Sequence, residues 1–192
     1  MGGTIKIGEI KTTIPNEVVK EAFLSKNKKA RKKIVEQIVV SNIIQKMMKK
    51  NEKTLFGVSI YFTDNSFSHF SGQIQRFIGS TIKKELDKNG INSKFMGYTK
   101  DRKAQLSNVE ILKKNLIENQ AEILFCIGKK EAWIASTVSI HNPFEFQKRD
   151  IYKPNQRTIF GMPPRLARIM VNLSGCNQKK TLLDAFCGVG TI

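Results

Sequence analysis

The pattern of apolar and polar residues predicts a compact α+β unit in the middle of the chain. Residues 73–88 carry apolar side chains at every third or fourth position, which is typical of an amphipathic helix, and Gly90 can end that helix in a left-handed conformation. Ser107 and Glu110 have the spacing of a capping box, which predicts a second helix that runs to about residue 118. Apolar runs rich in β-branched and aromatic residues predict four strands, over residues 55–62, 93–100, 122–127 and 131–140.

The N-terminal residues combine a short strand pattern with a basic helix pattern. Residues 4–7 alternate between polar and apolar and predict a strand. Between Lys26 and Lys53, lysine and arginine far outnumber the acidic residues Glu36 and Glu52. Apolar residues at positions 40, 43, 44 and 47 have the spacing of one helical face. Two interpretations are open: a basic helix that lies along a phosphate backbone, or solvated lysines over an apolar stripe.

Beyond residue 141 the pattern indicates a linker and the start of another domain. Residues 142–158 are polar and charged and contain two prolines, which is typical of a linker. The proline pair at positions 163 and 164 favours the first turn of a helix. The buried stripe of that helix is expected to be Leu166, Ile169, Met170 and Leu173. Residues 181–186 then predict the first buried strand of an α/β domain.

The charge of the chain favours a polyanionic partner. The formal net charge is +17, from 33 lysines and arginines against 16 acidic residues. A generally basic proteome, a charge that serves solubility and an anionic membrane surface are the alternatives. No apolar stretch approaches the length of a membrane span, and no signal peptide opens the chain.

The cysteines and histidines predict no metal site. Cys126, Cys176 and Cys187 show no paired spacing, which favours reduced thiols in the cytoplasm over a zinc site. His69 and His141 are too few and too far apart in the sequence to suggest a metal cluster.

A glycine-rich turn follows the last predicted strand and carries the most specific chemistry of the chain. Glycines there allow a ligand to approach the backbone closely, and the helix that follows such a turn presents free N–H groups. Asp184 ends the apolar run and is suited to bind an ammonium group. The string differs from a dinucleotide fingerprint, which needs a third glycine, and from a P-loop, which needs a lysine.

Residues 184–191, Asp-Ala-Phe-Cys-Gly-Val-Gly-Thr, resemble motif I of class I S-adenosylmethionine-dependent methyltransferases, in the Phe-Cys-Gly variant of RNA base-amino methylases. Residues 144–150 and 161–173 resemble the segment that links a THUMP domain to its methylase domain. They look most like the archaeal-type tRNA guanine-10 N2-methyltransferases. Residues 1–8 resemble the end of the N-terminal ferredoxin-like region of that family, and residues 55–141 are similar to a THUMP domain in element order.

This resemblance implies a fold class and four regions. The fold would be an α+β THUMP-like RNA-binding domain followed by the first helix and strand of an α/β Rossmann-like methyltransferase domain. The expected regions are the remainder of the ferredoxin-like region with a basic helix (1–54), the THUMP-like domain (55–141), the linker (142–160) and the truncated start of the methyltransferase domain (161–192).

The resemblance also implies the substrates and the residues that bind them. The intact enzyme would bind S-adenosylmethionine and transfer a methyl group to the exocyclic amine of a guanine in tRNA. The cofactor-binding positions would be Asp184, Phe186, Cys187, Gly188, Gly190 and Thr191.

Basic residues of the THUMP-like part and the linker are the candidates for RNA binding, because they can neutralise phosphates. They are Arg76, Lys83, Lys84, Lys94, Lys100, Arg102, Lys103, Lys148 and Arg149. Phe95 and Tyr98 lie among them and either stack on unpaired bases or fill the core, with the core favoured for Phe95. For Trp133 a place in the core is favoured over a stacking role.

The family's catalytic string, Asp/Asn-Pro-Pro-Tyr/Phe, does not occur in these 192 residues. We expect it to lie beyond Ile192 in the intact enzyme. We therefore expect no methyl transfer by this chain alone and no catalytic residue within it. Two further interpretations are open: a non-catalytic RNA-binding module, or half of a split methyltransferase whose second chain supplies the rest.

Overall fold

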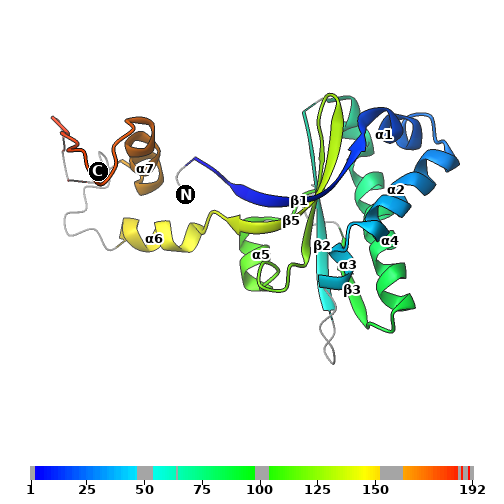
Figure 1. Cartoon of the computed structure of the whole chain (residues 1–192). Coiled ribbons are helices and arrows are strands. Elements are labelled where there is room, and N and C mark those ends of the chain that lie inside the picture. Colours follow the sequence, from blue (N-terminus) through cyan, green and yellow to red (C-terminus); the bar gives the residue numbers. More distant parts are fainter. Residues whose placement is uncertain are drawn as a thin grey trace. The chain divides into compact units, whose positions relative to one another are not determined.

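A computed structural model gives the fold of the protein (Figure 1). The structure describes residues 3–46, 54–63, 65–97, 104–151 and 162–185, together with 187 and 190. Contacts between residues divide the chain into two compact units, one formed by residues 7–139 and the other by residues 1–6 and 140–192. We describe each unit by itself. Within the described part of the chain, no helix has the length and apolar character of a membrane span.

The larger unit is built on a mixed five-stranded sheet, which confirms the predicted α+β class. The strands are β1 (Lys6–Pro15), β2 (Thr54–Phe62), β3 (Ser93–Met96), β4 (Glu122–Ile127) and β5 (Glu131–Ile140). Their order in the sheet is β1-β5-β4-β2-β3. Strand β2 runs parallel to β3 and β4, and β4 pairs antiparallel with β5. The central strands β2 and β4 are buried along most of their length, which explains their continuous apolar sequences.

Helices cover both faces of this sheet. The described residues contain α1 (Asn16–Phe23), α2 (Lys28–Val40), α3 (Ile43–Lys46), α4 (Ser71–Lys88), α5 (Asn108–Lys113), α6 (Pro143–Ile151) and α7 (Pro164–Leu173), with a 3₁₀ helix at Asn65–Phe70. Helices α1, α2 and α4 lie on one side of the sheet and α5 on the other (Figure 1). The predictions of strands at 55–62, 122–127 and 131–140 and of the helix at 73–88 are confirmed. The strand predicted over 93–100 begins as expected and ends at Met96, and residues 98–100 lie outside the described ones.

Helix α4 supplies the core on its side of the sheet. Its buried stripe is Ile74, Ile78, Ile82 and Leu86, each fully buried. This four-residue repeat keeps the stripe on one helical face. Each such side chain contributes roughly 1.5–3 kcal/mol relative to an exposed one. The helix ends as predicted, with Gly90 at φ 73°.

Phe95 packs in this core rather than facing solvent. Its ring lies 5.4 Å from the ring of Phe56, measured between centroids. Gly79 of α4 lies against the same ring, since a Cβ atom there would approach the ring to 2.3 Å. The interpretation of Phe95 as a core residue is therefore confirmed.

The N-terminal residues form more structure than their sequence pattern indicated. Strand β1 extends over ten residues and pairs with β5, and α1 follows it directly. The strand predicted at residues 4–7 overlaps β1 only at residues 6 and 7. Exposed and buried positions of β1 lose strict alternation in the middle of the strand, so the alternation of a half-buried strand is not present along its full length. Strand β1 from residue 7 onward and helices α1 and α2 belong to the same compact unit as β2, β3, β4 and β5 up to residue 139. The assignment of residues 1–54 to a ferredoxin-like region stays a prediction.

The helix predicted across positions 40–47 is wrong. Helix α2 ends at Val40, which is 71 % exposed, and α3 begins at Ile43. Between them Asn42 adopts φ 54°, a left-handed conformation that asparagine tolerates and that interrupts a helix. Ile43 and Ile44 are buried, whereas Met47 lies outside the described residues.

The second predicted helix has the correct start and a wrong end. The Ser107 side chain accepts the backbone N–H of Glu110, and the Glu110 side chain accepts the N–H of Ser107, so the capping box is confirmed. Helix α5 then ends at Lys113 instead of reaching residue 118. Asn115 adopts φ 49°, and this left-handed residue ends the helix early.

A buried asparagine fixes the β4–β5 turn. Asn16, the first residue of α1, is 3 % exposed. Its side-chain amide donates to the carbonyls of Gly128 (2.7 Å) and Lys129 (3.0 Å), and its backbone N–H donates to the carbonyl of Lys130 (2.9 Å). These three hydrogen bonds join the start of α1 to the β4–β5 hairpin, and they orient the carbonyls of the turn toward Asn16.

Candidate functional site

The candidate cofactor site begins with helix α7 of the smaller unit. Pro164 opens this helix, as predicted, and Gly175 follows its end at φ 66°. Its apolar residues, however, do not form the expected buried stripe. Leu166, Met170 and Leu173 are 46 %, 44 % and 81 % exposed. The described residues after this helix form no strand that could cover it, which explains why these apolar side chains are exposed.

The predicted strand at residues 181–186 is also wrong for the residues that the structure describes. Residues 181–184 have no regular secondary structure, and residue 185 lies in a turn. A parallel strand is stabilised by hydrogen bonds to neighbouring strands. No described strand lies beside these residues in the sheet order, and Leu183 is 86 % exposed.

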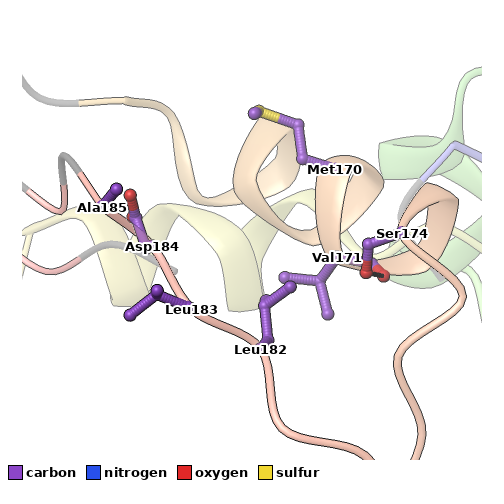
Figure 2. A pocket seen from close by; sticks show the side chains of 7 residues that line it. All are labelled: Met170, Val171, Ser174, Leu182, Leu183, Asp184 and Ala185. Carbon is purple, nitrogen blue, oxygen red and sulfur yellow. Dashed lines mark hydrogen bonds between the residues drawn. The ribbon is translucent and has the colours of Figure 1, made fainter.

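A small hollow lies between α7 and residues 182–185 (Figure 2). Its volume is about 220 Å³. The lining residues are Met170, Val171, Ser174, Leu182, Leu183, Asp184 and Ala185. Figure 2 shows the helix residues on one side and the extended segment on the other. Asp184, which is half-buried, is the only ionisable residue among these described lining residues.

Three of the predicted cofactor residues lie in the described part of the chain. Besides Asp184 these are Cys187, which is exposed, and Gly190. The Gly190 N–H donates to the Cys187 carbonyl at 2.8 Å and closes a turn. Gly190 adopts φ 70°, and no atom would lie within 4 Å of a Cβ placed there. The other three, Phe186, Gly188 and Thr191, lie outside the described residues.

The end of the chain, which follows the predicted motif, is also not described by the structure. Ile192, beyond which we expect the catalytic string, also lies outside the described residues. The structure therefore does not test the expectation that the catalytic residues follow Ile192, and it stays a prediction.

The described residues of the loop fit the amino-acid end of a small zwitterionic cofactor. The Asp184 carboxyl group can accept hydrogen bonds from an ammonium group, and the open left-handed glycine lets a carboxylate approach the backbone. The prediction of these positions as cofactor ligands stays a prediction. Within the described residues, no group of three histidine, cysteine, aspartate or glutamate side chains could hold a metal ion.

Four of the predicted RNA-binding residues lie in the larger unit. Arg76, Lys83 and Lys84 are exposed on α4, and Lys94 is exposed on the neighbouring edge strand β3. The Arg76 side chain donates to the backbone carbonyl of Gly72 in the preceding turn. The helix therefore brings three of the predicted basic residues onto one element. Lys94 is separate from them, because the ring of the adjacent Phe95 contacts α4 and successive side chains of a strand point to opposite faces of the sheet.

Two others lie in the smaller unit, in the last turn of α6. This helix occupies residues that we predicted as a linker. Lys148 and Arg149 are both exposed. The Arg149 guanidinium lies 5.5 Å from the ring centroid of Phe146, and that ring lies 4.7 Å from the ring of His141. This stack fixes the position of Arg149 on the helix.

Lys100, Arg102 and Lys103, and the aromatic residue Tyr98, lie outside the described residues. The chain that follows them is firmly attached to the sheet. The Ala104 carbonyl accepts the N–H of Ile60 (2.7 Å), and the Gln105 side chain donates to the Ile60 carbonyl (3.0 Å). The predicted role of the cluster at 100–103 in RNA binding stays a prediction.

A buried polar network lies next to this attachment and was not predicted. Glu122 of β4 is fully buried, and its two carboxyl oxygens accept the hydroxyls of Ser59 and Thr137, each at 2.7 Å. The Ser59 hydroxyl also accepts the backbone N–H of Leu106 at 3.0 Å. Nothing in the sequence marks Glu122 as buried except its place at the start of an apolar strand.

Tyr61 of β2 and Trp133 of β5 lie in one row across the sheet, on the two strands that flank β4. Each pairs with Cys126 of β4, which stands between them, and all three are half-buried. Burial raises the pKa of the Tyr61 hydroxyl, and electrostatic repulsion by Glu122 and Cys126 raises that pKa further. Trp133 also contacts the turn, because a Cβ atom at Gly128 would lie 2.7 Å from its ring.

Helix α2 carries the first part of the basic stretch between Lys26 and Lys53, for which the sequence leaves two interpretations open. Lys28, Lys29, Lys32 and Lys33 are all exposed on this helix. No acidic residue lies between Glu21 and Glu36, so these lysines have no acidic neighbour in the sequence.

Comparison with known families finds a similarity in the C-terminal segment. Residues 154–192 match a family described as RMKL-like, methyltransferase domain. The matched residues include α7, the hollow and the turn at Gly190. This match supports a methyltransferase-like function, for which S-adenosylmethionine is the usual cofactor. Residues 1–153 lie outside the match. No curated protein matches the chain.

Proposed function

We propose that the protein takes part in S-adenosylmethionine-dependent methylation of tRNA in the cytoplasm, with the N2 amine of guanine-10 as the target. The observation that carries this proposal is the methyltransferase match over residues 154–192. Within that segment, the Phe-Cys-Gly form of the loop resembles the loop of RNA base-amino methylases. The proposal extends the general methyltransferase function to one cofactor, one substrate and one position.

The smaller unit would hold the methionine end of the cofactor. S-adenosylmethionine supplies an electrophilic methyl group on a sulfonium when it is bound. Asp184 would accept hydrogen bonds from the ammonium group, and the turn closed by Gly190 would leave room for the carboxylate. The apolar hollow beside Asp184 would exclude water from that ion pair and so strengthen it.

The larger unit would bind the tRNA as a THUMP-type domain. Exposed basic side chains on α4 and β3 can neutralise phosphates, and the net charge of +17 favours such a partner. The basic turn of α6, with Lys148 and Arg149, would add contacts from the smaller unit.

A methylation assay tests the proposal. The complete product of the reading frame is incubated with tritiated S-adenosylmethionine and a tRNA transcript, and the modified nucleoside is identified after digestion. We expect N2-methylguanosine or its dimethyl form, and no incorporation when guanine-10 is replaced by adenine. Incorporation at another base would contradict the proposed target. Binding of tRNA without any incorporation would support a non-catalytic RNA-binding module instead.

The variant Asp184→Asn tests the cofactor site separately. Loss of a charge-assisted hydrogen bond should weaken binding by roughly 1.5–3 kcal/mol, about a factor of 10 to 100 in Kd. Calorimetric titration with S-adenosylmethionine measures this change. The control is Asp87→Asn, an exposed aspartate of α4, which should bind the cofactor like the wild type. Equal affinity of the wild type and Asp184→Asn would exclude the assigned role.

A further inference from the structure

The first half of α2 and the loop before it carry a dense group of cations. We define the α2 lysine cluster as Lys26, Lys28, Lys29, Lys32 and Lys33. All five are exposed, and no acidic residue lies between Glu21 and Glu36. The opposite face of the helix carries the buried stripe of Ala30, Ile34 and Ile38, so the lysines face solvent and the apolar residues face the core.

These lysines stand where a helix disfavours them. Lys28 and Lys29 occupy the first turn of α2, which has no acidic residue, and the N-terminal end of a helix carries partial positive charge. Lys28 and Lys32, and Lys29 and Lys33, are like-charged neighbours one turn apart. The cluster therefore makes an unfavourable electrostatic contribution to the helix, so helix stability does not account for these lysines.

The backbone conformation of Lys26 is also unfavourable for a lysine. The residue adopts φ 53°, a left-handed conformation that glycine or asparagine ordinarily occupies. A glycine here would relieve the strain but would remove the side-chain charge. This position thus keeps a cation where the backbone favours a different residue.

The cluster is held on a fixed support. The Arg31 side chain donates to the Ala22 carbonyl at 2.9 Å, and its guanidinium lies 5.7 Å from the ring centroid of Phe23 and 5.9 Å from that of Phe77. This arginine therefore joins α2 to α1 and α4. Asn27 caps the helix by accepting the Lys29 N–H at 2.9 Å. The lysine side chains are thus the groups available to a partner.

We infer that the α2 lysine cluster binds the phosphate backbone of RNA. This inference rests on the proposed function and adds a surface to it. Lysines one turn apart are separated by about 6 Å along the helix axis, so several can bind phosphates of one strand at once. A membrane is a poorer fit, because Ile34 and Ile38 are fully buried and cannot enter a bilayer.

Two matched double variants of the full-length protein test the inference. Lys28→Gln/Lys29→Gln removes two charges from the cluster. Lys113→Gln/Lys114→Gln removes the same charge at the end of α5, on the opposite face of the sheet. Affinity for a tRNA transcript is measured by filter binding over a range of salt concentrations, and thermal unfolding is followed by circular dichroism.

We expect the cluster variant to bind tRNA on the order of tenfold more weakly, with a salt slope that is flatter by about one to two. Its melting temperature should rise, because charge repulsion and the unfavourable interaction with the helix end are removed. The α5 variant should keep its affinity, and its melting temperature should not rise, because lysines at a helix C-terminus are favourable. Weaker binding by a more stable protein cannot be attributed to misfolding.

Two results would overturn the inference. They are unchanged tRNA affinity of the cluster variant and equal losses of tRNA affinity in the two variants. In each case the wild type still binds tRNA, so only the surface is refuted and the proposed function is left to the methylation assay. A wild type that binds no tRNA would refute the proposed function itself.

Discussion

Replacement of Ser59 by alanine should destabilise the larger unit more than its small change in volume suggests. The Ser59 hydroxyl is fully buried in the central strand β2. It donates to Glu122 of β4 at 2.7 Å and accepts the backbone N–H of Leu106 at 3.0 Å. A single hydroxyl therefore joins the sheet to the segment that leads into α5.

The hydrogen bonds set the expected magnitude. Ser59→Ala removes one donor to a buried carboxyl group and the acceptor of a backbone N–H, and each loss costs about 1–2 kcal/mol. The total is then about 2–4 kcal/mol, a large part of the roughly 5–15 kcal/mol by which domains are usually stable. Thr137→Val keeps the side-chain shape and removes only one donor to Glu122, so it should cost about 1–2 kcal/mol.

Urea denaturation measures both changes. The chain has one tryptophan, Trp133 in β5, so its fluorescence reports on the sheet. The control is Ser80→Ala, because the Ser80 hydroxyl is exposed on α4 and donates only within its own helix. This variant should stay within about 0.5 kcal/mol of the wild type. A change that small for Ser59→Ala would refute the bridging role, and equal effects of Ser59→Ala and Thr137→Val would show that the Leu106 bond contributes nothing.

Two further variants test the half-buried Tyr61 and the buried Asn16. Tyr61 has a raised pKa in the folded protein, so its hydroxyl stays neutral while an unfolded tyrosine ionises near about pH 10. The stabilising contribution of the neutral hydroxyl is present below that pH and is lost as the pH rises above it. Tyr61→Phe should therefore lose less stability than the wild type between about pH 9 and pH 11, when the free energy of unfolding is measured at each pH. Parallel curves of this free energy against pH for the two proteins would count against the prediction. Asn16→Ala removes the two side-chain bonds to the β4–β5 turn and should cost about 2 kcal/mol, with faster amide hydrogen exchange in the hairpin; unchanged exchange there would show that the turn does not depend on Asn16.

The sequence indicates the chemistry of the candidate cofactor site without the structure. A glycine-rich string next to an acidic residue indicates its chemistry locally, and Gly190 does close a turn at positive φ. The strand expected before it did not form in the described residues, because a parallel strand depends on neighbours that the local sequence cannot supply. The string alone therefore predicts a class of site, and the surrounding sheet decides its geometry.

The sequence by itself determined the type and extent of the central elements. The spacing of apolar residues in β2, β4, β5 and α4 reflects which side chains must face the core. The helix cap at Ser107 depends on hydrogen bonds between residues that are three positions apart. Both are local properties, so a pattern along the chain is enough to identify them.

Only the tertiary structure decided which distant residues meet. It placed β1 beside β5, brought α1 and α2 into the same unit as the sheet, and joined Ser59 to Glu122 across 63 positions of sequence. It also showed that Arg31 packs on Phe23 and Phe77, whereas the neighbouring lysines face solvent. The physical reason is that strand pairing and side-chain packing depend on the whole assembled core, and residues far apart in the chain carry no local signal of the partner that they will contact.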